Sequence, residues 1–258
     1  MHASKFTFDD DPSGKEIAYI ENGDWDGYIL TVTESPEVTE LDLGKDATFK
    51  VGKINPILDP NKRSVVYIAG PSGSGKSTFA ASLLKIYCYP RVMYFGRGTE
   101  NLDPAYENCS EIECIDINSP DFVVAMENLK LESIEPGSVL IFDDVLSVMD
   151  TTVKDVLIKL MVDAMEIGRK LNLNVIITSH VVIPIEQKFA RKLLPEIQDL
   201  VVFPGFAGRS NINYVLTKHI QLEPSQVRRI LDTKTSRWVL VHTTVPMYVL
   251  TEKEAYML

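Results

Sequence analysis

The chain has 258 residues, of which 45% are hydrophobic and 24% are charged, and its net charge is −10. This length allows one large α/β domain with an appendage and a substantial hydrophobic core. The sequence has no apolar run near the length that spans a bilayer, and its N-terminal residues lack the apolar stretch of a signal peptide. We therefore expect a globular protein with no transmembrane segment.

The acidic residues are concentrated near the N-terminus. Residues 1–60 carry thirteen Asp or Glu and five Lys, whereas the rest of the chain is close to neutral. We interpret the acidic segment as a solvated surface, so it says little about the partners of the remainder. The three cysteines, Cys88, Cys109 and Cys114, have no Cys or His partners at metal-binding spacing. This pattern predicts reduced thiols and a cytoplasmic location.

The first 60 residues are predicted to form a β-rich appendage. Residues 16–21 and 28–33 carry β-forming side chains, and the Asn-Gly-Asp turn signal between them predicts a hairpin. Residues 48–54 are a further candidate strand, followed by a linker that contains two prolines. We therefore predict two domains, the acidic appendage at 1–60 and a larger domain at 61–258.

From residue 65 onward strands and helices alternate, which predicts an α/β fold with a mostly parallel central sheet and helices on both faces. Apolar runs mark candidate strands at residues 65–69, 91–95, 112–116, 138–142, 173–178 and 199–203. The apolar residues within 152–171 recur at helical spacing and predict a long helix. Beyond residue 205 the pattern becomes antiparallel, with candidate strands at 211–216, 237–242 and 247–250 and a charged helix at 223–232.

Residues 65–78 read VVYIAGPSGSGKST and carry the most informative motif of the chain. A short strand is followed by the pattern Gly-x-x-x-x-Gly-Lys-Ser and then by a helix, which is the context that a phosphate-binding loop requires. The glycines let successive backbone N–H groups turn toward phosphate oxygens. Lys76 would contact the β- and γ-phosphates of ATP, and the Ser77 hydroxyl would bind Mg²⁺. The predicted nucleotide-binding residues are Gly70, Pro71, Ser72, Gly73, Ser74, Gly75, Lys76, Ser77 and Thr78.

Two further apolar runs end in polar side chains. The strand at 138–142 is followed by Asp143 and Asp144. Asp143 is the predicted Mg²⁺ ligand beside Ser77, and Asp144 is the candidate general base for the attacking water. His180 ends the run Val-Ile-Ile-Thr-Ser-His and is a candidate contact for the γ-phosphate or that water. The alternatives are two solvated acids in a turn and a histidine that only caps its strand.

The candidate strand at 112–116 lies between the loop strand and the Asp strand along the chain. An extra strand inserted between these two strands distinguishes the additional-strand ATPases from the kinases and GTPases. Residues 112–116 therefore favour hydrolysis that drives motion over phosphoryl transfer to a small molecule.

Three segments, GPSGSGKST, LIFDD and EIGRKLNLNVIITSH, together resemble the viral DNA-packaging ATPases of large double-stranded DNA viruses. These poxvirus-type enzymes belong to the FtsK/HerA-like translocase superfamily. The resemblance covers roughly residues 64–250 and leaves residues 1–60 unassigned. The chain departs from the family pattern at three positions, because Asp144 replaces the usual Glu, His180 the commoner Gln and Lys170 the His. These departures concern the rate of ATP hydrolysis and the sensing of hydrolysis by the rest of the subunit. They leave nucleotide binding unchanged.

The resemblance implies a homo-oligomeric ring, a pentamer or hexamer, that uses Mg-ATP to move double-stranded DNA into a viral capsid. Such motors hydrolyse ATP at subunit interfaces, where an arginine of the neighbour stabilises the transition state. Arg169 is the leading candidate for this role because it lies in the family-like stretch, and Arg97 and Arg209 are the others. A capsid or portal protein is a further candidate partner. The protein would then act in the host cytoplasm, at the viral assembly site or in association with the virion.

A basic excess in the C-terminal part predicts a surface that follows DNA phosphates. An ordinary solvated helix face is the alternative. The acidic residues within this part include Glu223 and Asp232. The basic residues are Lys188, Arg191, Lys192, Arg209, Lys218, Arg228, Arg229, Lys234 and Arg237.

Three other functions compete with a DNA motor. A transporter-type ATPase subunit requires a Leu-Ser-Gly-Gly-Gln signature before the Asp strand, and the sequence has none. A nucleotide or nucleoside kinase needs an acceptor pocket and usually an Arg-rich lid, for which residues 97–110 are a poor match. A non-enzymatic nucleotide switch would not require the pair Asp143 and Asp144.

Overall fold

The computed structural model divides the chain into two compact units. One unit consists of Met1–Asn55 together with Asp199–Leu258, and the other is Pro56–Gln198. This grouping crosses the boundary predicted at residue 60, because strands from both ends of the chain pair with one another in the first unit. The structure describes residues 5–7, 14–33, 38–51, 63–86, 89–98, 100, 102–107, 109, 112–182, 192–206 and 208–258.

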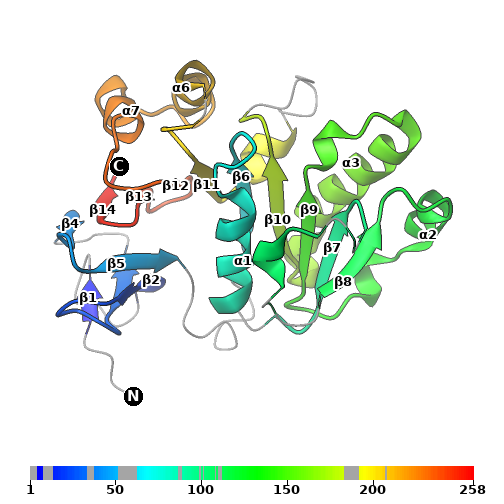
Figure 1. The fold of residues 1–258 in the computed structure, drawn as a ribbon, viewed down its shortest axis with the longest axis horizontal. Coiled ribbons are helices and arrows are strands. Elements are labelled where there is room, and N and C mark those ends of the chain that lie inside the picture. The colour runs from blue at the N-terminus through cyan, green and yellow to red at the C-terminus, as the bar shows by residue number, and fades with distance from the viewer. Residues whose placement is uncertain are drawn as a thin grey trace. The chain divides into compact units, whose positions relative to one another are not determined.

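A parallel sheet forms the centre of the unit Pro56–Gln198 (Figure 1), with the strand order β6-β10-β9-β7-β8. All residues of β6 and β7 are buried, as expected for parallel strands that are covered on both faces. The predicted α/β fold with a mostly parallel sheet is confirmed. The strands are β6 (Val65–Ala69), β7 (Val92–Gly96), β8 (Ile112–Asp116), β9 (Val139–Asp143) and β10 (Asn174–Ser179).

Helices connect the strands of this unit, and α1 packs against β6 and β10. The α-helices are α1 (Lys76–Ile86), α2 (Phe122–Asn128), α3 (Thr151–Glu166) and α4 (Gly168–Leu171). Short 3-10 helices are η3 (Pro104–Tyr106), η4 (Leu131–Ser133), η5 (Val145–Ser147) and η6 (Leu194–Glu196). In the described part of the chain, no helix is both long and apolar enough to cross a membrane.

The strand that separates β6 from β9 is β10, which pairs in parallel with both. Residues 112–116, which were predicted to be this inserted strand, form β8 at the edge of the sheet, where it pairs with β7. The prediction was wrong on this point, although an additional strand is present. The burial of the two strands gives the reason. β8 contains no fully buried residue, as an edge position allows, whereas β10 is buried from Val175 to Ser179.

The long helix predicted at 152–171 is two helices. The first, α3, begins after Asp150, whose side chain accepts a hydrogen bond from the backbone N–H of Val153 at 3.0 Å. The break comes at Gly168, a residue type that weakens a continuous helix. Asn172 then ends α4 in a left-handed conformation, with φ of 52°.

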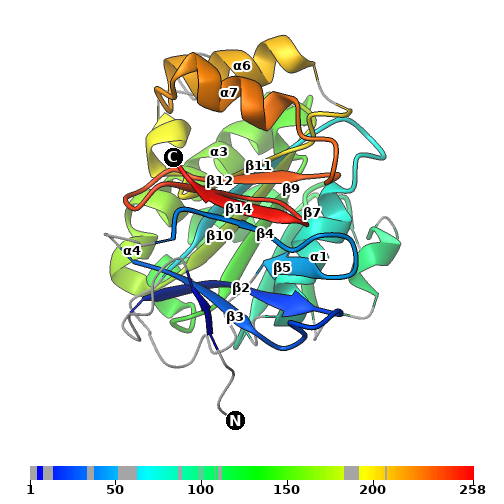
Figure 2. The same cartoon turned by 90° about the vertical axis from the view of Figure 1, so that its left-hand side faces the viewer.

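Antiparallel pairing dominates the unit formed by Met1–Asn55 and Asp199–Leu258 (Figure 2). The strand orders are β1-β3-β2-β5, in which β1 and β3 are parallel, and β4-β14-β13-β12-β11. The predicted hairpin between β2 and β3 is confirmed, and its turn residues Asn22 and Gly23 have φ of 67° and 72°. The strands are β1 (Lys5–Thr7), β2 (Lys15–Glu21), β3 (Ile29–Val32), β4 (Glu40–Asp42), β5 (Thr48–Val51), β11 (Asp199–Val202), β12 (Val239–His242), β13 (Tyr248–Leu250) and β14 (Glu254–Met257).

The strand predicted at 211–216 is part of a helix, α6 (Arg209–Lys218), which packs against α7 (Pro224–Leu231). The alternation of Ile212, Tyr214 and Leu216 is typical of a strand. The side chains that become buried are instead Ile212, Val215 and Leu216, at helical spacing, while Tyr214 is half exposed. The helix predicted at 223–232 is confirmed as α7.

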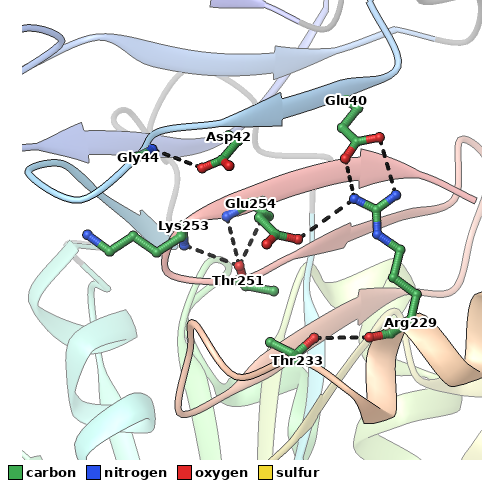
Figure 3. Close-up of polar contacts among 8 residues, drawn as sticks. All are labelled: Glu40, Asp42, Gly44, Arg229, Thr233, Thr251, Lys253 and Glu254. Carbon is green, nitrogen blue, oxygen red and sulfur yellow. Dashed lines mark hydrogen bonds and ion pairs between the residues drawn. The ribbon is translucent and has the colours of Figure 1, made fainter.

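Arg229 of α7 joins strands that are far apart in the sequence (Figure 3). Its guanidinium donates to both carboxylate oxygens of Glu40 on β4 and lies 3.7 Å from the Glu254 carboxylate on β14. It also stacks on the Tyr256 ring, with 3.6 Å between Cζ and the ring centroid. Because β4 pairs with β14, this one side chain holds an N-terminal strand, a C-terminal strand and a helix together.

Replacing Arg229 by methionine is expected to lower the free energy of unfolding by about 1–2 kcal/mol, because the ring stacking and the ion pairs are lost. The Arg229 side chain is 39% exposed, so the stacking contributes more than each ion pair does. Urea unfolding measures the change. Arg228→Met on the exposed side of the same helix is the control, with an expected change below about 0.5 kcal/mol. Equal stability of the two variants would contradict this role for Arg229.

Candidate active site

The predicted phosphate-binding loop connects β6 to α1. Gly73 and Gly75 have φ of 73° and 110°, conformations that glycine adopts without strain. The backbone N–H of Gly70 donates to the carbonyl of Ser179 at 3.0 Å and anchors the loop to the end of β10. The predicted binding residues 70–78 therefore lie at the carboxyl end of β6 and in the first turn of α1, where helical N–H groups favour an anion.

Lys76 is the first residue of α1 and is only 7% exposed. Its ammonium group lies 3.4 Å from the Pro71 carbonyl oxygen and 3.5 Å from Nδ1 of His180, both at the long limit for a hydrogen bond. A buried ammonium group is costly unless strong partners surround it. A phosphate would supply short charge-assisted hydrogen bonds, so the position of Lys76 fits phosphate binding.

Asp143 is the last residue of β9, and both of its carboxylate oxygens accept short hydrogen bonds. Thr178 of β10 donates to Oδ1 and Tyr94 of β7 donates to Oδ2, each at 2.6 Å. Burial, together with the negative charge of Asp143, raises the pKa of the Tyr94 hydroxyl, so this group stays a donor. Three neighbouring strands thus hold one carboxylate.

Asp144 follows directly and has a left-handed backbone conformation, with φ of 50° and ψ of 24°. This conformation is uncommon for residues other than glycine. Its backbone N–H donates to the Thr178 hydroxyl at 3.1 Å. In the side chain, Oδ2 lies 2.7 Å from Nε2 of His180, while Oδ1 is buried without a hydrogen-bond partner among the residues that the structure describes. This oxygen is the atom that can accept a proton.

Burial raises the pKa of Asp144. The positive charge of Lys76 partly offsets this effect, and the negative charge of Asp143 adds to it. A general base works best when its pKa lies near the operating pH. The surroundings of Asp144 therefore move its pKa in the direction that a base requires.

His180 bridges the loop lysine and the second acid. Its Nδ1 faces the Lys76 ammonium group, and its Nε2 faces the Asp144 carboxylate. A neutral imidazole with its proton on Nε2 satisfies both contacts, because Lys76 donates and Asp144 accepts. The His180 side chain is 44% exposed and can therefore respond to a bound ligand.

The available oxygen atoms fit Mg²⁺ bound together with a nucleotide. In the described ranges, no group of three or more His, Cys, Asp or Glu side chains is placed to hold a metal by itself. Mg²⁺ is usually held by one or two carboxylates together with the phosphates of the substrate. The Ser77 hydroxyl in α1 and the Asp143 carboxylate at the end of β9 would supply the protein ligands.

The three arginines that the sequence singled out lie in different places. Arg97 directly follows the carboxyl end of β7, and the loop follows the carboxyl end of β6. The positive charge of Arg97 lowers the pKa of Asp144. Arg169 in α4 precedes the amino end of β10, so a strand of six residues, about 20 Å long, separates it from the loop. Arg209 begins α6 in the other unit. The structure brings together four predicted residues: Lys76, Asp143, Asp144 and His180.

Several basic side chains predicted to contact DNA have partners within the protein. Arg209 pairs with Asp232 at 2.5 Å, and Arg229 belongs to the cluster of Figure 3. Arg237 lies 4.8 Å from the centroid of the Phe206 ring. Part of the predicted basic surface is thus engaged in internal contacts. Exposed basic residues of the set are Lys192, Lys218, Arg228 and Lys234, whereas Lys188 and Arg191 lie outside the described residues.

Sequence reasoning missed Thr178 and Tyr94. Thr178 lies directly opposite Asp143 in the pairing of β10 with β9, so aligning the ends of the two strands could have found it. Tyr94 stands within the apolar strand Val-Met-Tyr-Phe-Gly and reads as an ordinary core residue. No local signal in the sequence distinguishes it.

Comparisons with known proteins place the chain in a family. No protein-family model matches it. The uncharacterized protein V3 of Sputnik virophage is 31% identical over 246 residues, which cover 93% of this chain and 94% of V3. Identity at this level over nearly the whole of both chains shows a common family.

A solved structure shares the fold. B204, the DNA-packaging ATPase from Sulfolobus turreted icosahedral virus, matches with a TM-score of 0.50 and 13% identity, covering 74% of this chain and 98% of B204. The cytoplasmic domain of the Thermomonospora curvata type VII secretion ATPase EccC has a TM-score of 0.48 and 14% identity, covering 95% of this chain and 29% of that one. The chain therefore belongs to the family of the virophage protein V3 and has the fold of a viral DNA-packaging ATPase, the fold that the resemblance in its sequence motifs implied.

Proposed function

We propose that the chain is an ATPase that uses Mg-ATP to move double-stranded DNA and packages a viral genome as a homo-oligomeric ring, a pentamer or hexamer. The observation that carries the proposal is the contact series at the phosphate-binding loop. Lys76 lies 3.5 Å from His180, which in turn lies 2.7 Å from Asp144. A protein that only bound nucleotide would not need a buried carboxylate oxygen without a partner beside the loop lysine. The description of B204 as a DNA-packaging ATPase supports DNA as the polymer that is moved.

The reaction would be hydrolysis at the γ-phosphate. Lys76 and the loop N–H groups bind the phosphates and take up the charge that develops on them. Mg²⁺, held by Ser77 and Asp143, would neutralise phosphate charge when bound. Oδ1 of Asp144 accepts a proton from the attacking water while the water oxygen bonds to the γ-phosphorus. The bond from this phosphorus to the bridging oxygen breaks, which leaves ADP and inorganic phosphate.

The position of Arg169 supports hydrolysis at a subunit interface. Arg169 lies beyond the amino end of β10, whereas the loop of its own chain lies at the carboxyl end of this strand, so Arg169 would act on the site of a neighbour and stabilise the transition state there. A ring offers each subunit such a neighbour. A capsid or portal protein would be the docking partner of this ring, in the host cytoplasm or at the site of viral assembly.

Steady-state ATP hydrolysis with and without double-stranded DNA tests the proposal. We expect duplex DNA to raise the rate and the stimulation to weaken as salt increases, because phosphate contacts release counterions. Lys76→Ala serves as the blank. Hydrolysis that is indifferent to DNA would contradict a DNA motor and favour a kinase, to be tested with small-molecule acceptors. A wild-type chain without ATP hydrolysis would contradict the assignment as an ATPase.

A further inference from the structure

The carboxylate of Asp143 is held at both of its oxygens by hydroxyl groups. Thr178 and Tyr94, each with a hydrogen bond of 2.6 Å, are 0% and 2% exposed. A carboxylate offers about four lone-pair positions, so about two remain for a metal ion or its bound water. The orientation of Asp143 is thus set by the protein before any ligand binds.

The Thr178 hydroxyl acts on both acids. It donates to the side chain of Asp143 at 2.6 Å and accepts the backbone N–H of Asp144 at 3.1 Å. Strand register explains its position, since Thr178 lies directly opposite Asp143. The left-handed conformation of Asp144 needs support from its surroundings, and this hydrogen bond supplies part of it.

Tyr94 reaches Asp143 because a glycine leaves room for its ring. A Cβ atom added at Gly96 would lie 2.3 Å from Cε1 of Tyr94 and 3.1 Å from its hydroxyl oxygen. Any other residue at position 96 would therefore displace the ring. The Tyr106 ring packs edge-on against it, with 5.5 Å between the centroids. The ring of Tyr94 is thus aimed at the carboxylate by its neighbours.

We propose that Tyr94 and Thr178 are positioning residues that hold the Asp143 carboxylate in the orientation in which it binds the nucleotide-associated metal. The inference rests on the proposed function. Groups that orient a metal ligand strengthen metal binding because the ligand needs no further ordering. Both hydroxyls donate to Asp143, and that of Thr178 also accepts the backbone N–H of Asp144. Their loss should therefore weaken the contribution of the metal and leave metal-free nucleotide binding unchanged.

The test measures the affinity of the full chain for a non-hydrolysable ATP analogue, with and without Mg²⁺, by calorimetry. In Tyr94→Phe and Thr178→Val we expect metal-free affinity to stay within about twofold of wild type, and the gain from Mg²⁺ to fall about ten- to a hundredfold. Thr178→Ser keeps the hydroxyl and should restore the gain. Gly96→Ala should behave like Tyr94→Phe, because it displaces the ring.

Tyr67→Phe is the matched control. Tyr67 is a fully buried tyrosine of β6. Its hydroxyl donates to the Val181 carbonyl at 2.8 Å and does not contact Asp143. We expect wild-type Mg²⁺ dependence in this variant, and thermal unfolding shows that each variant is folded. The inference would be overturned if folded Tyr94→Phe and Thr178→Val proteins kept the full increase in nucleotide affinity that Mg²⁺ gives the wild type. It would also be overturned if Tyr67→Phe lost as much of this increase as they do. A wild-type chain that binds no nucleotide, or gains nothing from Mg²⁺, would instead overturn the proposed function.

Discussion

Asp144→Asn is expected to slow ATP hydrolysis by about a hundred- to ten-thousandfold, the range for loss of a positioned general base. Asparagine has nearly the shape of aspartate and tolerates the left-handed conformation at residue 144, where φ is 50°. Its amide can keep the contact with His180, but it cannot take up a proton from water at neutral pH. The loss should therefore fall on kcat, and nucleotide affinity should not decrease.

The same substitution is expected to raise the stability of the folded chain at neutral pH. Burial raises the pKa of Asp144, so the folded state binds its proton more tightly than the unfolded chain does. The stabilisation from this tighter binding is fully present below the unfolded pKa of about 3.9, and it is lost as the pH rises through the folded pKa. At neutral pH the partly buried carboxylate therefore carries a cost that asparagine lacks. Variant and wild type should differ most at neutral pH and least in acid.

Thermal unfolding without nucleotide or Mg²⁺, at about pH 4 and about pH 7.5, measures the stability effect, and steady-state kinetics measures turnover. Asp155→Asn on the exposed side of α3 is the control, and it should change neither quantity. An Asp144→Asn variant with wild-type turnover would place the general base elsewhere. A lower melting temperature at neutral pH would mean that the contact between Asp144 and His180 outweighs the cost of burial.

The main side chains of the candidate site could be predicted because they follow one rule of parallel sheets. Residues after the carboxyl ends of neighbouring strands meet at one edge, so Asp143 and His180 come close to the loop that carries Lys76. Tyr94 follows no such rule. Its contact with Asp143 depends on the pairing of β7 with β9 and on the space above Gly96. Both are properties of the assembled sheet, which a local pattern does not contain.

The fold shows the same limit. Runs of apolar residues located β6, β9 and β10, because burial on both faces leaves a strong local pattern. Strand order was not predictable in this way, and β8 was assigned to the interior although it lies at the edge. The short strand β4 carries even less signal. Its three residues gain their structure from pairing with the other end of the chain, where Glu40 lies opposite Tyr256, and from the contact between Glu40 and Arg229.

Lys76→Ala is expected to lower both nucleotide affinity and turnover, which distinguishes it from Asp144→Asn. Loss of one preorganised donor to a transferring phosphoryl group slows a reaction about a hundred- to thousandfold. Lys76 is only 7% exposed, so its charge acts in a site where water screens it weakly. The ammonium group holds the phosphates in the bound state as well as in the transition state. Kd and kcat should therefore change together.

Lys85→Ala in the last turn of the same helix is the matched control, because Lys85 is exposed and lies away from the loop. Binding of a fluorescent ATP analogue measures affinity, and phosphate release measures turnover. If only turnover fell in Lys76→Ala, the loop N–H groups alone would account for binding, and Lys76 would act in the transition state only. If Lys76→Ala bound and hydrolysed ATP as well as Lys85→Ala, Lys76 would contact the phosphates neither in the bound state nor in the transition state.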